Sequence, residues 1–317
     1  MTRVVVTGAY GFIGAALVRK LLGGLSQVGT VDAVLAVDLQ SAHHDVDIRL
    51  RWLEGSVSDP AVLDQVCAFR PDLVFHLASV PGGAAERDYA LGRQVNLDAT
   101  ADWLQAFGAL GTCPRFVYAS SIAVYGDKLP TQVDEHTPAA PALSYGVHKR
   151  VCELLVSDAS RRGWVTGCSL RLPGIVARPG VATGLMSAFM SEVFWALAEG
   201  RPVTLPVRPE GTAWWLSVSA CVDNLLRAAA CDPDTYRPDR TYQMPALYLS
   251  VEKVVDALLQ QFGSERRSLV RYVPDEHIHR LFASYPPLHT PDALTLGLRH
   301  DGDVHSLVRA ALLGFRK

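Results

Sequence analysis

The stretch that most constrains the fold is "RVVVTGAYGFIGAALV", near the N-terminus. A β-branched run ends there before a turn, and a helical pattern then extends from Phe12 to about Leu22. Three glycines stand at three-residue intervals between this strand and this helix: Gly8, Gly11 and Gly14. Glycines in that position allow a tight turn, a close approach of backbone to pyrophosphate, and close helix–strand packing. The first helical residues, Phe12 and Ile13, would present N–H groups to the phosphates. We therefore predict a dinucleotide-binding turn.

Apolar runs alternate with helical patterns along the next part of the chain. The runs expected to be strands are residues 31–39, 49–55, 71–79, 114–121 and 166–176. The expected helices are 60–69, with Asp59 as its N-cap, about 85–109, and 144–162. This alternation predicts an α/β fold, a Rossmann-type doubly wound parallel sheet with a smaller C-terminal α+β lobe. The expected nucleotide-binding domain is 1–175, with about 212–245 returning to it. The expected substrate-binding lobe is 176–211 and 246–317.

Asp38 ends the second predicted strand, 24 positions after Gly14. A carboxylate there accepts hydrogen bonds from the adenosine ribose hydroxyls and repels a 2′-phosphate. The "LQSAHHD" that follows contains no Arg or Lys to attract such a phosphate. We therefore predict NAD as the cofactor in preference to NADP. The alternative role of Asp38 is to cap the end of the strand.

Composition argues against several classes of partner. The 317 residues are 49% hydrophobic, their formal net charge is -2, and no long run of one charge sign occurs. We expect no nucleic acid and no membrane partner, because no apolar run is long enough to cross a bilayer. No signal peptide is expected either. The six cysteines are scattered without CxxC or metal-ligand spacing, which predicts reduced thiols, no metal site and a cytoplasmic location.

A tyrosine and a lysine lie one helical turn apart in "LSYGVHKRVCELL": Tyr145 and Lys149. Tyrosine titrates at about pH 10, so it serves as a base at neutral pH only where a cation stabilises its phenolate. Chance alone often supplies this spacing. The predicted strand "PRFVYASS" adds support, because Ser120 and Ser121 end it at the carboxyl edge of the sheet, where ligands bind. Together with the glycine turn, these residues predict a catalytic site.

These motifs resemble those of the extended short-chain dehydrogenases/reductases, the NAD-dependent epimerase/dehydratase family. The family signatures correspond here to "TGAYGFIG", to Ser121 ahead of "VYG", and to Tyr145 with Lys149. The resemblance implies hydride transfer between a secondary alcohol and NAD, with Tyr145 as base, Lys149 stabilising its phenolate and Ser121 holding the substrate oxygen. It also implies cofactor contacts at Ser56, Val57, Leu77, Ala78, Ser79, Asn96, Pro173, Ile175 and Val176. Gly55-Ser56 departs from the usual Gly-Asp at the adenine.

The resemblance also bears on the substrate. Sugar-nucleotide enzymes of the family carry "FN" after the sixth strand, where this chain reads "RLPG", and dehydratases need an acid that is missing beside Ser121. The chain is more similar, over nearly its whole length, to members that oxidise small sugar acids such as D-erythronate. The substrate contacts that this likeness implies are Val80, Ser120, Ser121, Ile122, Tyr145, Arg178 and Trp215.

Departures from those members fall where the substrate should lie. Leu185, Met186 and Trp215 stand in place of polar residues and a histidine. A buried hydroxyl without a hydrogen-bond partner is costly. We therefore expect a small hydroxy acid, either D-erythronate or a related compound that is more apolar or aromatic. Arg178 is expected to pair with its carboxylate. The alternatives are an exposed arginine in a Pro/Gly loop, and tryptophans that only pack the lobe.

Two other functions stay open at this point. One is a sugar epimerase that keeps its NAD bound, and the other is a non-catalytic NAD-sensing protein. Net formation of NADH from an alcohol would distinguish both from a dehydrogenase. We also expect a homodimer through the helices predicted at 85–109 and 144–162, by analogy with the family.

Overall fold

The computed structural model describes residues 2–24, 27–41, 47–180 and 186–313. Its main sheet has seven strands in the order β10-β6-β5-β4-β1-β2-β3, and every pairing is parallel. The strands are β1 (Arg3–Thr7), β2 (Ala33–Asp38), β3 (Leu50–Glu54), β4 (Leu73–His76), β5 (Arg115–Ser121), β6 (Thr166–Leu172) and β10 (Thr241–Gln243). The strand order reverses between β1 and β4, which is the switch point where such folds bind ligands. The predicted fold class is confirmed.

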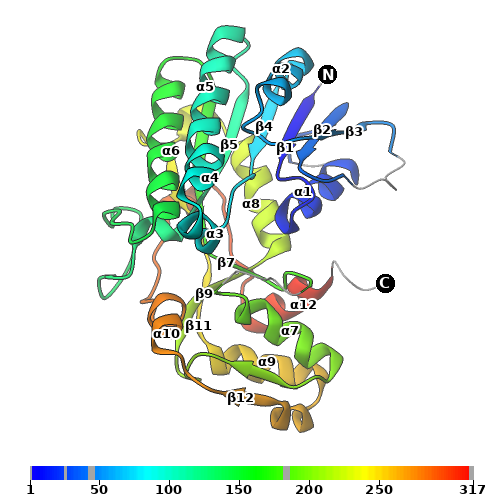
Figure 1. Cartoon of the computed structure of the whole chain (residues 1–317). Helices are drawn as coiled ribbons and strands as arrows, with labels where there is room; N and C mark the ends of the chain where they lie inside the picture. The colour runs from blue at the N-terminus through cyan, green and yellow to red at the C-terminus, as the bar shows by residue number, and fades with distance from the viewer. Residues whose placement is uncertain (1, 25–26, 42–46, 181–185, 314–317) are drawn as a thin grey trace.

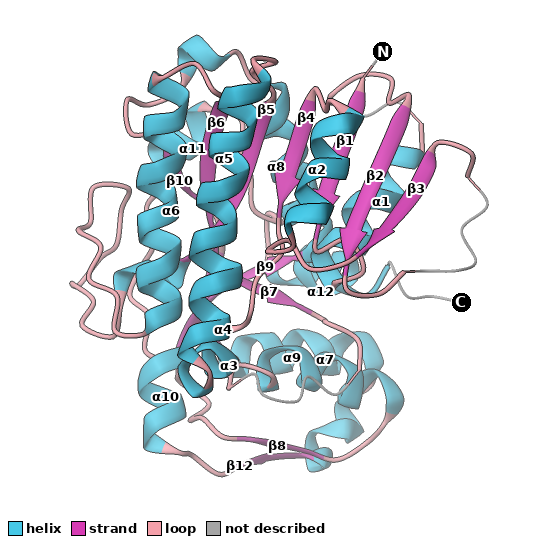
Figure 2. Cartoon of the chain, turned by 45° about the horizontal axis from the view of Figure 1, so that its top comes forward, coloured by secondary structure: helices cyan, strands magenta, loops and turns pink. Residues whose placement is uncertain are grey.

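Helices cover both faces of this sheet (Figure 1, Figure 2). One face packs against α1 (Phe12–Leu22) and α8 (Val218–Ala230), and the other against α2 (Pro60–Phe69), α5 (Ala99–Leu110) and α6 (Ser144–Arg161). In β1, Val4 and Val6 enter the core on the first side and Val5 enters the core on the second. Side chains of a strand alternate between faces, so a strand buried on both sides is apolar throughout. Asp59 caps α2 through the Ala61 amide, as predicted.

The smaller lobe lies at the carboxyl edge of the sheet, at the bottom of Figure 1. Its elements are β7 (Gly174–Val176), α7 (Phe189–Glu199), β8 (Val203–Leu205), β9 (Thr212–Ser217), β11 (Leu247–Ser250), α9 (Val251–Phe262), η4 (Ser264–Leu269), β12 (Val270–Tyr272), α10 (Glu276–Phe282) and α12 (Val304–Leu313). β9 pairs with β7 in parallel and with β11 in antiparallel fashion, while β8 pairs with β12. α7 and α9 bury their apolar faces in a core of this lobe's own. No helix in the described ranges is long and apolar enough to cross a bilayer.

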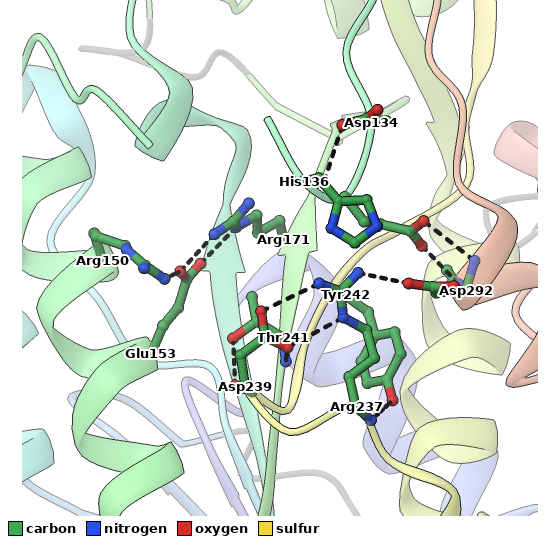
Figure 3. A network of polar contacts seen from close by, with 12 residues as sticks. Asp134, His136, Arg150, Glu153, Arg171, Arg237, Asp239, Thr241, Tyr242 and Asp292 are labelled. Carbon is green, nitrogen blue, oxygen red and sulfur yellow. Dashed lines mark hydrogen bonds and ion pairs between the residues drawn. The ribbon is translucent and has the colours of Figure 1, made fainter. Parts of the chain in front are cut away.

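The chain passes between the two domains more than once. After β9, α8 and β10 return to the main sheet, with η3 (Pro233–Thr235) between them. β9 itself, which opens the segment expected to return, belongs to the sheet of the lobe. α11 (Pro291–Thr295) also packs beside the main sheet, next to β10. Arg237 holds it there through an ion pair with Asp292 at 2.6 Å (Figure 3).

Two elements were expected to be continuous, and in the structure each is divided into shorter elements. The helix expected over about 85–109 consists of α3 (Gly82–Arg87), α4 (Tyr89–Arg93), the π-helical η1 (Gln94–Asp98) and α5. Asp88 leaves the helical conformation, and its side chain caps α4 by accepting from the Leu91 amide. The strand expected over 166–176 ends at Leu172, because Pro173 has no N–H to donate to a neighbouring strand. β7 then starts in the other sheet.

Candidate active site

A cavity of about 970 Å³ opens at the carboxyl edge of the main sheet, between the two domains. All but three of the residues expected to contact cofactor or substrate line it. The exceptions are Asn96, Val176 and Trp215. The described residues contain no group of three or more His, Cys, Asp or Glu side chains suited to hold a metal ion.

The glycine turn is shaped by close contacts that a side chain would block. Gly8 has φ +68°, and a Cβ there would lie 2.9 Å from the Ala78 nitrogen. A Cβ on Gly14 would lie 2.0 Å from the Gly8 carbonyl oxygen, so only glycine lets α1 start this close to β1. No side chain caps α1 at Gly11. A helix start left uncapped at the switch point fits the pyrophosphate of a dinucleotide.

Asp38 faces the same cavity with its carboxylate already oriented. Its two oxygens accept hydrogen bonds from the backbone amides of Tyr10, at 2.9 Å, and Leu39, at 2.7 Å. Each oxygen retains a second lone pair, so the group can still accept from two vicinal hydroxyls. The carboxylate fits a ribose and would repel a phosphate at the same place.

A buried chain of hydrogen bonds forms the floor beside this turn. Thr7 accepts from the amides of Leu77, at 3.0 Å, and Ala78, at 3.1 Å, so its own proton goes to Nδ1 of His76 at 3.2 Å. Thr100 donates to the Asn96 carbonyl, so Nε2–H of His76 donates to the Thr100 oxygen. His76 is therefore neutral. Burial, with a smaller contribution from the nearby Lys149 charge, lowers its pKa to about 3.

Lys149 brings a positive charge beside Tyr145. Its side chain is 2% exposed, and its Nζ donates to the Ala119 carbonyl at 2.7 Å. The same Nζ lies 5.6 Å from the ring centroid of Tyr145 and 4.8 Å from that of Tyr118. Burial raises the pKa of Tyr118 well above its usual value, so that phenol stays neutral. Of the two tyrosines near the ammonium, Tyr145 is the one that lines the cavity.

A glycine next to Tyr145 lets α6 pack closely on the segment that follows Ser121. The short helix η2 (Ile122–Tyr125) follows β5, and Ser121 caps it by accepting from the Ala123 amide at 3.1 Å. A Cβ on Gly146 would lie 2.4 Å from the Ala123 carbonyl oxygen, so α6 could not otherwise pack this closely on η2. No acceptor among the residues that the structure describes takes the hydroxyl proton of Ser121, so this hydroxyl can donate into the cavity. Gly146 was not among the predicted site residues, although a glycine directly after the tyrosine of a helix was the available signal.

Ser120 also lines the cavity, but its hydroxyl serves a buried ion network. It donates to Glu153 at 2.6 Å, and Glu153 forms a two-bond pair with Arg171, each bond 2.9 Å long. Arg150 contacts the same carboxylate at 2.9 Å (Figure 3). Glu153 is 1% exposed and Arg171 is 6% exposed, so each charge needs the other. The network joins the ends of β5 and β6 to α6. It thereby fixes the strand that carries Ser121 relative to the helix that carries Tyr145.

Arg178 lies at the lobe side of the cavity. The preceding residue, Ala177, has φ +60°. The guanidinium of Arg178 lies 5.5 Å from the ring centroid of Phe12. No Asp or Glu among the described residues forms an ion pair with it. Burial lowers its pKa, and the nearby Tyr145 offsets part of that shift. A half-buried arginine without a counter-ion is a site for an anion.

The three residues outside the cavity have structural contacts instead. Asn96 holds both backbone groups of Val80, accepting from its N–H at 2.7 Å and donating to its carbonyl at 3.0 Å. Val176 is fully buried in the core of the lobe. Trp215 is buried there too, and its Nε1 donates to the Leu249 carbonyl. The expectation that Trp215 faces the substrate is wrong, because β9 alternates and turns Trp214 towards the cavity.

The lobe contributes several cavity residues that the sequence analysis did not identify as substrate contacts: Ser187, Met190, Ser191, Trp214, Phe282 and Tyr285. Met186, expected to make the pocket less polar, does line it. Leu185 lies outside the described residues. The apolar members predominate, so this end of the cavity offers one cation and a few hydroxyls on a largely apolar wall.

Comparisons with known proteins agree with this geometry. The model of the NAD-dependent epimerase/dehydratase family matches residues 4–237. D-Erythronate dehydrogenase of Cupriavidus necator is 36% identical over 313 residues, which cover 97% of each chain. The enzyme of the same name from Haemophilus influenzae is 30% identical, covering 97% of this chain and 98% of its own.

A crystal structure from Agrobacterium tumefaciens, described as a nucleoside-diphosphate-sugar epimerase, superimposes with a TM-score of 0.92. It is 30% identical, and the match covers 99% of this chain and 94% of that one. The predicted family, the enzymatic character and the predicted cofactor are confirmed. The chain belongs to the NAD-dependent epimerase/dehydratase family and is an NAD-dependent dehydrogenase.

Proposed function

We propose that this dehydrogenase oxidises a secondary hydroxyl of a small hydroxy acid, with D-erythronate as the first candidate. Two relatives named D-erythronate dehydrogenase, similar over almost the full length, support this substrate. The observation that carries the proposal is Arg178, a cation that lines the cavity without a carboxylate partner among the described residues. A substrate carboxylate would supply that partner.

The chain's own side chains provide acid–base chemistry for this reaction. Tyr145 takes the proton of the substrate hydroxyl, and the positive charge of Lys149 favours the phenolate that does so. Ser121 donates a hydrogen bond to the substrate oxygen, which becomes a carbonyl oxygen. Bound NAD supplies the acceptor for the hydride. We propose that the glycine turn, Asp38 and Lys149 hold that cofactor along the cavity.

The apolar wall favours a second, related class of substrate. Met186, Met190, Trp214 and Phe282 line the lobe side and offer no strong hydrogen bond to a polyol within the cavity. The indole nitrogen of Trp214 already donates to the Pro286 carbonyl. A hydroxy acid with an alkyl or aryl group would bury that group against this wall. Its carboxylate would still need Arg178.

A sugar-nucleotide epimerase is the competing function, since the relative from Agrobacterium tumefaciens is described in those words. Lys149 and Arg178 are the Lys and Arg side chains that line the cavity in the described residues. Lys149 already donates to the Ala119 carbonyl, so Arg178 is the cation left to bind a substrate anion. One arginine balances the single charge of a carboxylate better than the charges of the two phosphates in a sugar nucleotide. An epimerase or an NAD sensor would also give no net NADH.

The test measures NADH formation from D-erythronate, other four-carbon sugar acids, aryl-substituted hydroxy acids and UDP-sugars. We expect activity with at least one carboxylate substrate. Arg178→Gln should raise the KM for that acid about tenfold or more, because a charged hydrogen-bonded pair is lost, while the Kd for NAD should change little. Arg271→Gln, which changes the exposed residue of β12, is the matched control. Epimerised UDP-sugar without net NADH would contradict the proposal.

We further propose a homodimer in the cytoplasm. α4 and α6 expose large apolar side chains on one side of the molecule: Tyr89, Leu91, Val147 and Leu154. A second copy would cover them, and Leu154→Asp should then shift the protein to a monomer in analytical ultracentrifugation. An unchanged mass for this variant would argue against that face. The six cysteines are free, which supports a reducing compartment.

A further inference from the structure

Tyr285 forms a rigid part of the cavity wall. It lies in the connection between α10 and α11, and its backbone is bonded to β9 at both groups, with N–H to the Thr212 carbonyl at 3.0 Å and its carbonyl to the Thr212 hydroxyl at 2.6 Å. The next residue, Pro286, accepts from the indole of Trp214 at 2.7 Å. The rings of Tyr285 and Trp214 are 4.7 Å apart between centroids. The tyrosine is therefore fixed before any substrate arrives.

The hydroxyl of Tyr285 forms no hydrogen bond with the described part of the chain, whereas the backbone groups of Tyr285 and the indole of Trp214 do. Burial raises the pKa of this phenol to about 12, so it stays a neutral donor and acceptor at physiological pH. Tyr285 is partly buried, and its hydroxyl is not among the buried polar atoms that lack a partner, so a bound molecule can reach it and supply one. Tyr285 lines both the main cavity and a second cavity.

The second cavity holds about 230 Å³ and lies behind Tyr285, where Gly126, Asp127, Ser284 and Pro286 contribute to its lining. Tyr285 is the residue common to the linings of both cavities in the described structure. Tyr285 thus stands where the space beside the catalytic residues meets the second cavity. We expect that removing its ring would join the two.

Tyr285 lies on the side of the cavity where Ser121 is found. Ile122, the residue after Ser121, packs in one apolar cluster with Trp214 and Tyr285. Arg178, by contrast, contacts Phe12 at the start of α1. An acid whose carboxylate pairs with Arg178 and whose reacting oxygen meets Ser121 would extend its far end towards Tyr285.

We propose that Tyr285 determines substrate specificity: its hydroxyl bonds the terminal hydroxyl of the hydroxy acid, and its ring limits the length of the carbon chain. This inference rests on the proposed function and names the part of the substrate that is recognised. It predicts a preference for short acids that end in a hydroxymethyl group. The apolar wall, to which Met190 and Phe282 belong, would then pack against the carbon skeleton.

The first test compares D-erythronate with the analogue that carries a methyl group in place of the terminal hydroxymethyl. The wild-type enzyme should prefer D-erythronate about tenfold in kcat/KM, which is the value of one well-made hydrogen bond. Tyr285→Phe should lose most of that preference by losing activity with D-erythronate alone, with the Kd for NAD unchanged. Tyr248→Phe is the control, because the ring of Tyr248 is exposed on β11, and this variant should keep the wild-type ratio.

The second test uses Tyr285→Ala, which joins the cavities. This variant should gain kcat/KM with five- and six-carbon aldonic acids relative to D-erythronate. If the wild-type enzyme is active but Tyr285→Phe loses activity equally with both short acids, the recognition of the terminal hydroxyl is refuted and the proposed function stands. If the wild-type enzyme forms no NADH with any hydroxy acid, the proposed function and this inference both fall.

Discussion

His76 should make the protein sensitive to mild acid, and the size of the effect follows from its surroundings. The imidazole is fully buried, accepts from Thr7 and donates to Thr100, so it fits there only as the neutral form. Its pKa falls from the ordinary 6.5 to about 3 on folding. Between these values the unfolded chain binds one more proton than the folded chain, so lowering the pH favours unfolding.

The slope is about 1.4 kcal/mol per pH unit well below pH 6.5, and integration from pH 7 to pH 5 gives a loss of about 2 kcal/mol from this residue. The contribution is complete above pH 6.5 and is lost progressively as the pH approaches 3. Protonation would also place a second cation near Lys149 and take away the acceptor for Thr7. The hydrogen bonds that position Thr7, Leu77 and Ala78 at the cofactor site would therefore weaken as the protein loses stability.

Urea unfolding at pH 7 and pH 5 measures this directly. His76→Gln, whose amide can still donate to Thr100, should be less stable at pH 7 but should lose about 2 kcal/mol less than the wild type between the two pH values. His277→Gln, which removes an exposed histidine from α10, is the matched control and should keep the wild-type difference. If His76→Gln and the wild type lose the same stability, the neutral, hydrogen-bonded His76 is not the origin of the acid sensitivity.

Three further predictions concern the cofactor and the chemistry. Tyr145→Phe should keep NAD binding, followed by fluorescence titration, and lose about a thousandfold in turnover, since a positioned base is removed; retained turnover would assign the proton to another group. Gly14→Ala should weaken NAD binding and lower stability by about 2 kcal/mol, because its Cβ would overlap the Gly8 carbonyl oxygen; denaturation and binding curves like those of the wild type would contradict the close approach. Asp38→Asn keeps an acceptor but removes the charge, so the NAD-to-NADP ratio of kcat/KM should fall by about tenfold, whereas an unchanged ratio would mean that another residue excludes the phosphate.

The main sheet and the cofactor end of the site could be predicted because their signals are local. Strand, turn and helix adjoin at Gly8 and Gly14, and the turn works through backbone contacts that only glycine permits. The catalytic pair also lies within one helical turn. Each of these features is complete within a short stretch of sequence.

The lobe and the substrate end could not be predicted in the same way, because they depend on contacts between distant segments. "TAWWLS" alternates, but its sequence does not say which tryptophan faces the cavity, and the choice of Trp215 was wrong. Asn96 was expected at the cofactor and instead holds the Val80 peptide, a pairing that no spacing indicates. Tyr285 reaches the wall only through its bonds to Thr212, 73 positions away.

The position of β10 at the end of the main sheet has a consequence for how the protein is made. β6 is buried along most of its length, and its outer edge pairs with β10. The ribosome produces β10 only after α7, β8, β9 and α8. During that interval β6 is an unpaired edge that can template pairing with another chain. A fragment that stops before Thr241 would contain the glycine turn and the Tyr145 helix, yet we expect it to aggregate. We therefore expect nascent chains of this protein to need either a completed β10 or a chaperone that shields β6.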